Sequence, residues 1–149
     1  MLRNVSVPAV YCPSRCKWIP RKCSVFIWRL GMNKLATMDA LKKRNMDNGD
    51  GACVLCGDHE ETVEHLFTAC GVASTIWSVV SRKKDVIQGI VRIGCWCIWK
   101  SRNDIKFNNK EVKIEGIVRE IKSFGLFWYN ARSRGSEISW PEWRSFVNM

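Results

Sequence analysis

The 149-residue sequence lacks a continuous apolar run long enough to cross a bilayer. Its most apolar stretch, residues 86–99, is interrupted by Gln88 and Arg92, and its first eight residues lack the apolar core of a secretory signal. We therefore expect no membrane span, no secretion, and an intracellular location in the nucleus or cytoplasm. Without an oxidising compartment, the eight cysteines are expected to be reduced thiols rather than a disulfide framework.

Several enzymatic signatures are also missing. The chain contains no adjacent pair of aspartates, which the palm of a polymerase uses to hold two metal ions. A ribonuclease H needs clustered carboxylates on a sheet, but no strand pattern accompanies the acids that follow residue 100. There is no internal repeat and no low-complexity tract. We expect a protein that is not an enzyme and has no small-molecule substrate.

Basic residues are absent from residues 51–80, which contain four acids. Residues 1–50 carry ten Lys or Arg against three acids, and residues 81–149 carry fourteen against seven, so each flank has a charge of +7. Such a surplus favours a polyanion such as RNA or DNA, although Lys and Arg also solubilise aromatic-rich domains. The candidate phosphate contacts are Lys42, Lys43, Arg44, Arg82, Lys83, Lys84, Arg132 and Arg134.

The acidic segment between these flanks holds a metal-ligand spacing. Cys53, Cys56, His65 and Cys70 form a C-x2-C-x8-H-x4-C pattern, which supplies all four ligands of one tetrahedral zinc ion and leaves no open position for catalysis. Gly57 suits the turn after the cysteine pair, and Thr62 can cap the helix that follows. His65 and Cys70 are separated by about 140° on an ideal helix, so they can share a metal only if the helix ends near Cys70.

Other residue assignments stay open for this segment. His59 is a rival ligand, but it lies only three residues from Cys56, which would strain a site that also uses Cys70, so His65 is favoured. The three cysteines and the histidine could instead be ordinary buried residues that fill space in the core. A second metal site is disfavoured because the remaining cysteines lack a usual zinc spacing and a spare histidine; these are Cys12, Cys16, Cys23, Cys95 and Cys97.

Apolar residues recur at helical spacing through the rest of the chain. The first helix is predicted from Pro20 to Gly31, with four buried positions: Cys23, Phe26, Ile27 and Leu30. Thr37 is expected to cap a second short helix. Further helices are predicted over 62–70, 72–80, 86–100, 114–128 and 140–146, the fifth helix being weakened by Gly89 and Gly94. The fold class is therefore mostly α, a small helical domain organised around one Cys3His zinc knuckle and followed by amphipathic helices.

The tryptophans invite two interpretations. Aromatic rings can stack on nucleic-acid bases, but helical spacing beside Ile and Leu favours packing in the core. We expect core packing for Trp28, Trp77, Trp96, Trp99 and Trp128.

An ordered series of residues resembles a known family. The series comprises Ile19-Pro20-Arg21-Lys22, Phe26 to Leu30, Leu35-Ala36-Thr37, Leu41, Arg44, Cys53-x2-Cys56, Glu61, His65-Leu66-Phe67-x2-Cys70, Ala73 and Trp77. It resembles the zinc-binding domain at the C-terminal end of plant non-LTR (LINE-type) retrotransposon reverse transcriptases. Residues 96–104 are similar to the segment that often follows this domain.

The resemblance implies a zinc-stabilised accessory domain that binds RNA or DNA, in a retroelement ribonucleoprotein, on a fragment that lacks the polymerase. It implies three parts: an unmatched segment at residues 1–16, the zinc-binding domain at 17–80, and a Trp-rich helical extension at 81–149. Two alternatives stay open. One is a protein-interaction module built on the Trp-rich helices, and the other is a non-functional retroelement remnant.

Overall fold

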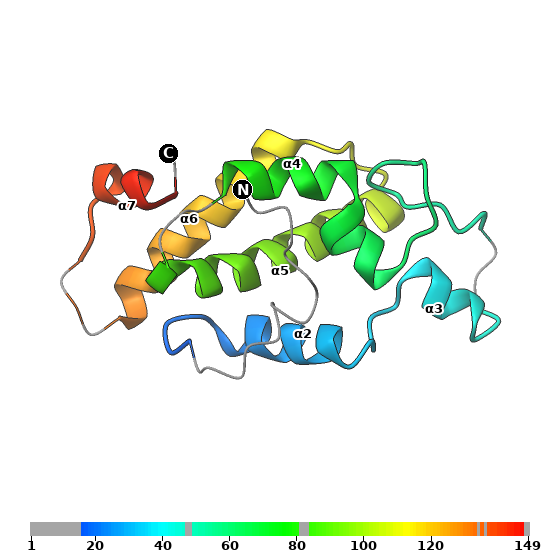
Figure 1. Cartoon of the computed structure of the whole chain (residues 1–149), viewed down its shortest axis with the longest axis horizontal. Helices are drawn as coiled ribbons and strands as arrows, with labels where there is room; N and C mark the ends of the chain where they lie inside the picture. The colour runs from blue at the N-terminus through cyan, green and yellow to red at the C-terminus, as the bar shows by residue number, and fades with distance from the viewer. Residues whose placement is uncertain (1–15, 47–48, 81–83, 134, 136, 148–149) are drawn as a thin grey trace.

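The structure, a computed structural model, describes residues 16–46, 49–80, 84–133, 135 and 137–147 (Figure 1). Its helices are α2 (Arg21–Gly31), α3 (Met38–Lys42), η1 (His65–Ala69), α4 (Gly71–Val79), α5 (Lys84–Asn108), α6 (Ile114–Arg132) and α7 (Trp140–Val147). Across the described ranges there is no β-strand, and the nearest feature is an isolated antiparallel bridge between Ala52 and Glu60. The predicted fold class, mostly α, is confirmed.

Helix α5 is the central element of the fold. It packs against α6 and α2, while α4 and α7 each pack against α6. Figure 1 shows α5 running between α4 and α2, with α6 alongside it. The buried apolar residues form one continuous core that extends from Trp18 to Trp143. None of the described helices combines the length and the apolar character that a bilayer span needs.

Helix α2 buries the face that its sequence pattern predicts. Cys23, Phe26, Ile27 and Leu30 are its buried residues, and the ring of Phe26 meets those of Phe67, Trp96 and Trp99. These contacts fasten α2 to both η1 and α5.

The tryptophans divide between the core and the surface. Trp77 and Trp128 are buried, and Trp96 and Trp99 are half-buried against the core. The expectation of core packing was wrong for Trp28, which is 49% exposed. Trp28 directly follows the buried Ile27, but each residue of an α-helix turns the side chain by about 100°, which carries Trp28 off the buried face.

Two glycines explain how α5 packs so closely. A Cβ atom at Gly94 would lie 2.5 Å from the ring of Trp77, and one at Gly89 would overlap the ring of Trp18. The glycines were expected to weaken this helix, yet α5 is continuous through both. Their role is to let two indole rings rest directly on the helix backbone.

We expect Gly94→Ala to lower the free energy of unfolding. The overpacking penalty of about 1–3 kcal/mol should exceed the gain in helix propensity of about 1 kcal/mol. Gly116→Ala in α6 is the matched control, because its Cβ would meet only the Lys113 Cβ at 3.6 Å. That variant should be neutral or more stable. Urea unfolding checks both, and equal stabilisation of the two variants would contradict the close ring contact at Gly94.

Candidate metal centre

The cysteine pair lies in a closed loop. The Gly57 N–H donates to the Cys53 carbonyl at 2.7 Å, and the Cys53 N–H donates to the His59 carbonyl at 2.7 Å. Gly57 has a φ of +76°, in the left-handed region that glycine adopts without steric cost, as its place after the pair predicted. The bridge between Ala52 and Glu60 fastens the base of the loop. This closure fixes the direction of the two thiols.

A π-helical turn positions the other two residues of the cluster. In η1 the Cys70 N–H donates to the His65 carbonyl at 2.7 Å, an i to i+5 bond that widens the turn. Because each turn holds more residues, two residues five positions apart point in more similar directions than they would on an α-helix. The helix ends at Cys70, whose backbone is extended. This is the helix end that the sequence required if His65 and Cys70 were to share a metal. Thr62 is the predicted cap, since its Oγ1 accepts from the His65 N–H at 3.0 Å.

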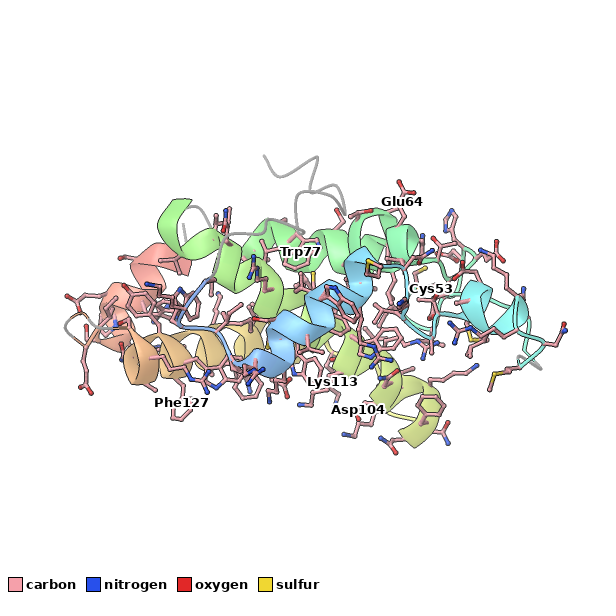
Figure 2. The ribbon with its side chains drawn as sticks, turned by 90° about the horizontal axis from the view of Figure 1, so that it is seen from below. Cys53, Glu64, Trp77, Asp104, Lys113 and Phe127 are labelled. Carbon is pink, nitrogen blue, oxygen red and sulfur yellow. The ribbon has the colours of Figure 1, made fainter. Side chains whose placement is uncertain are left out.

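The side chains of the four predicted ligands converge. The ligand atoms of Cys53, Cys56, His65 and Cys70 all lie within 4.8 Å of one another, and Cys56 Sγ is 3.2 Å from His65 Nε2. Sulfur atoms around a tetrahedral zinc with bonds of about 2.3 Å would stand roughly 3.8 Å apart, so the spacing fits. In Figure 2 the side chain of Glu64 points away from the ribbon. The cluster can hold a metal ion, and its sulfur-rich donors suit zinc.

The thiols of Cys53 and Cys70 shift each other's pKa in opposite directions. A hydrogen bond from Cys53 holds the pKa of Cys70 below its ordinary value, and the same bond, together with burial, raises the pKa of Cys53. Metal ligation requires thiolates, so part of the deprotonation that binding demands is already favoured at Cys70.

The cysteines outside this cluster behave as core residues. Burial raises the pKa of Cys23 to about 11 and that of Cys97 to about 12, and it also raises the pKa of Cys95. Such thiols stay protonated and unreactive. Among the described residues they join no group with metal-ligand geometry, and Cys12 lies outside the described residues.

His59 lies close to the cluster without completing it. Its exposed ring stacks on that of His65, with centroids 5.2 Å apart. It forms a separate, more exposed group with Cys56 and Asp58. Because Cys56 belongs to both groups and only His65 meets all three cysteines, the geometry favours the predicted set. The assignment of individual ligands stays a prediction.

Sequence reasoning missed a buried ion pair beside the cluster. Glu61 and Arg102 are 0% and 1% exposed, and Arg102 Nε lies 3.0 and 3.2 Å from the two carboxylate oxygens of Glu61. The Met38 N–H also donates to Glu61 Oε1, at 3.1 Å. Thr37 precedes α3 as predicted, but its hydroxyl donates to Asp39 Oδ1 instead of capping the helix. One carboxylate therefore joins α3, the metal loop and α5.

The candidate phosphate contacts that the structure describes do not gather on one surface. Lys42 lies 3.9 Å from Glu60, Lys43 lies 3.3 Å from Asp39, and Arg44 is exposed on the same segment. The exposed Arg132 donates to the carbonyl of Ile19 at 3.3 Å. Figures 1 and 2 place α3 and the end of α6 at opposite ends of the molecule. Arg82, Lys83, Arg134 and the side chain of Lys84 lie outside the described residues.

Comparison with known proteins relates residues 10–77 to a protein family. Searches of the curated proteins and of the solved structures found no match. The match is to a family described as zinc-binding in reverse transcriptase, and it covers residues 10–77, including α2, α3 and the whole cysteine–histidine cluster. Over residues 10–77 the chain is thus similar to the zinc-binding domain found in reverse transcriptases.

Proposed function

We propose that the protein is a non-catalytic, zinc-stabilised accessory that binds RNA or DNA. The match over residues 10–77 and the Cys3His cluster support this proposal. In the same proposal, the chain derives from a plant non-LTR retrotransposon. It would then act in a retroelement ribonucleoprotein, in the nucleus or cytoplasm. A bound zinc would supply structural cross-linking, since all four of its positions would be filled by protein.

The distribution of charge carries the proposal. Apart from the buried Arg92 and Arg102, every described Lys and Arg side chain is partly or fully exposed. None of these cations falls within residues 51–80, where four acids lie. Three thiolates would also exceed the charge of one Zn²⁺. Phosphates would therefore meet the helical flanks, and the metal segment would hold those flanks in place.

The test is nucleic-acid binding as a function of salt. If three phosphates of a single strand are contacted, affinity should fall roughly 20-fold between 50 and 200 mM salt, because each contact releases counterions. Fluorescence anisotropy with labelled single-stranded and duplex RNA and DNA measures this. Absence of binding at 50 mM salt, or an affinity that does not depend on salt, would contradict the proposal. Either result would favour a protein-interaction module or a non-functional remnant.

A further inference from the structure

A basic pocket lies where α4, α6 and α7 meet. It has a volume of about 360 Å³. Its lining consists of Val79, Ile114, Glu115, Val118, Arg119, Lys122, Trp140 and Arg144. The five residues from α6 follow helical spacing and share one face, and Trp140 and Arg144 are neighbours one turn apart on α7.

Helix α7 is firmly attached to α6, so its pocket-lining side chains are well placed. Trp143 is fully buried, and its Nε1 donates to the Lys122 carbonyl at 2.9 Å. Gly125 admits this ring, because a Cβ there would lie 2.6 Å from it. Ser139 and Glu142 form a capping box, with Glu142 Oε2 accepting from the Ser139 N–H at 2.8 Å and from its hydroxyl at 2.7 Å.

The segment before α7 is held as well. Asn130 Nδ2 donates to the Ile138 carbonyl at 2.9 Å, and the Ile138 N–H donates back to Asn130 Oδ1 at 3.0 Å. This pair of bonds resembles a short piece of sheet and fixes the approach of the chain to α6. The pocket is therefore a product of the fold and does not depend on a loose C-terminal helix.

The charges in the pocket favour an anion. Arg119, Lys122 and Arg144 line it, and Glu115 is the acid among the lining residues. Burial, and then the charge of Arg144, lower the pKa of Lys122. Cations held near one another in a partly desolvated place repel, and a bound phosphate relieves that repulsion.

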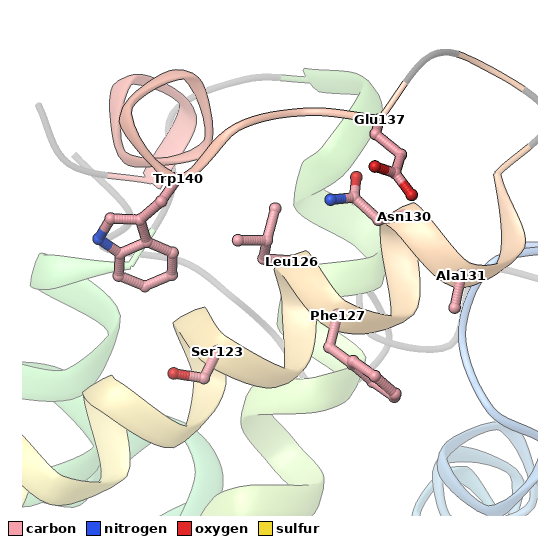
Figure 3. A pocket seen from close by; sticks show the side chains of 7 residues that line it. All are labelled: Ser123, Leu126, Phe127, Asn130, Ala131, Glu137 and Trp140. Atoms are coloured by element: carbon pink, nitrogen blue, oxygen red, sulfur yellow. The ribbon is translucent and has the colours of Figure 1, made fainter.

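The flat ring of Trp140 adds a second type of contact. Its side chain is 42% exposed at the rim of the pocket. It also borders a neighbouring pocket of about 540 Å³, whose other lining residues are Ser123, Leu126, Phe127, Asn130, Ala131 and Glu137. Figure 3 shows Trp140 at one end of that second pocket and Glu137 at the other. No Lys or Arg lines the second pocket, so an anion is expected to bind preferentially in the first.

We propose that the basic pocket binds one nucleotide of a single-stranded nucleic acid. In this arrangement Arg119, Lys122 and Arg144 contact the phosphate, and the base stacks on Trp140. The inference rests on the proposed function and gives it a location that the sequence did not indicate. A single strand is specified because its bases can leave their neighbours and stack on an aromatic side chain. The pocket volume lies within the usual range for small-ligand sites.

The experiment measures binding of a fluorescein-labelled 12-nucleotide oligothymidylate to the intact, zinc-loaded chain at low salt. Trp140→Ala should weaken binding at least about fivefold, the lower bound for loss of one stacked base. Arg144→Gln should weaken it to a similar extent and reduce the salt slope by about 1. The variant Trp140→Phe keeps an aromatic surface and should retain most of the affinity.

Matched controls come from α2. Trp28→Ala removes an indole of similar exposure, 49%, and Arg29→Gln removes an exposed cation from the last turn of a helix, as Arg144→Gln does. Each control should change the affinity less than about twofold, because neither residue lines the pocket and interactions between distant exposed charges are weak. Unchanged thermal unfolding of all five variants would show that they fold.

The outcomes separate the pocket from the wider proposal. If wild-type protein binds with salt dependence but Trp140→Ala and Trp28→Ala have equal effects, the pocket is wrong and the proposed function stands. An equal effect of Trp140→Ala on duplex binding would overturn the stacking contact. If the wild-type protein does not bind at all, both ideas fail.

Discussion

Replacing Cys53 by Ser is expected to abolish metal binding and unfold the loop that surrounds it. Cys53 is fully buried and its Sγ lies within 4.8 Å of the other three ligand atoms, so the change removes one of the four ligands from the centre of the cluster. Structural zinc contributes on the order of 10–16 kcal/mol of apparent binding free energy, which exceeds the stability of most small domains. Zinc content by mass spectrometry and far-ultraviolet circular dichroism would measure the two losses.

The control for this change is Cys97→Ser. Cys97 is also fully buried, but it lies in α5 and outside the cluster. That variant should retain one zinc per chain and lose only about 1–3 kcal/mol of stability, the usual cost of burying a poorly paired hydroxyl. If Cys53→Ser and Cys97→Ser retained equal amounts of zinc and equal helicity, the cluster would have no structural role.

Removing Arg102 should produce the second largest effect. Arg102→Met leaves the carboxylate of Glu61 buried without its cation, and breaking a buried pair in this way costs about 3–5 kcal/mol. The double variant Glu61→Gln, Arg102→Met should cost less than the sum of the single changes, because it removes the unpaired charge. Urea unfolding of the zinc-loaded protein gives all three values.

An exposed pair supplies the comparison for this cycle. Lys43 lies 3.3 Å from Asp39 on α3, and its side chain is 75% exposed. Lys43→Met should therefore change stability by less than about 1 kcal/mol. Additive effects at Glu61 and Arg102, or a loss at Arg102 no larger than that at Lys43, would show that the buried pair does not couple the two elements.

The buried pair has a consequence for the organisation of the chain. Glu61 lies within the matched residues 10–77, and Arg102 lies in α5 beyond them. The core likewise includes residues from both parts. The division into segments at residue 80 stays a prediction, but the zinc-binding region and the following helices share buried contacts.

Local patterns carried most of what the sequence could predict. The buried face of α2, the turn at Gly57 and the cap at Thr62 all depend on residues close together in the chain, so spacing reveals them. The gathering of the four ligand atoms required one further element, the π-helical turn at His65. No residue pattern identifies its i to i+5 hydrogen bond. The sequence could show only that the helix must end near Cys70 if His65 and Cys70 are to share a metal.

Long-range features could not be read from the sequence. Glu61 and Arg102 are 41 positions apart, and a single acid and a single arginine have no spacing that identifies them as partners. The basic pocket combines residues of α4, α6 and α7, which only tertiary packing brings together. The sequence showed only cations that are consecutive in the chain, such as Lys42 to Arg44. Two of those three cations pair with nearby acids.

X-ray absorption at the zinc edge of the purified, reduced protein tests the central claim most directly. The structure predicts one zinc per chain with three sulfur neighbours at about 2.3 Å and one nitrogen neighbour at about 2.0–2.1 Å, from Cys53, Cys56, Cys70 and His65. Any zinc that His65→Ala still binds should lack the nitrogen neighbour, and His59→Ala should leave the spectrum unchanged. A folded protein without zinc, or a zinc that keeps its nitrogen neighbour in His65→Ala, would contradict the account.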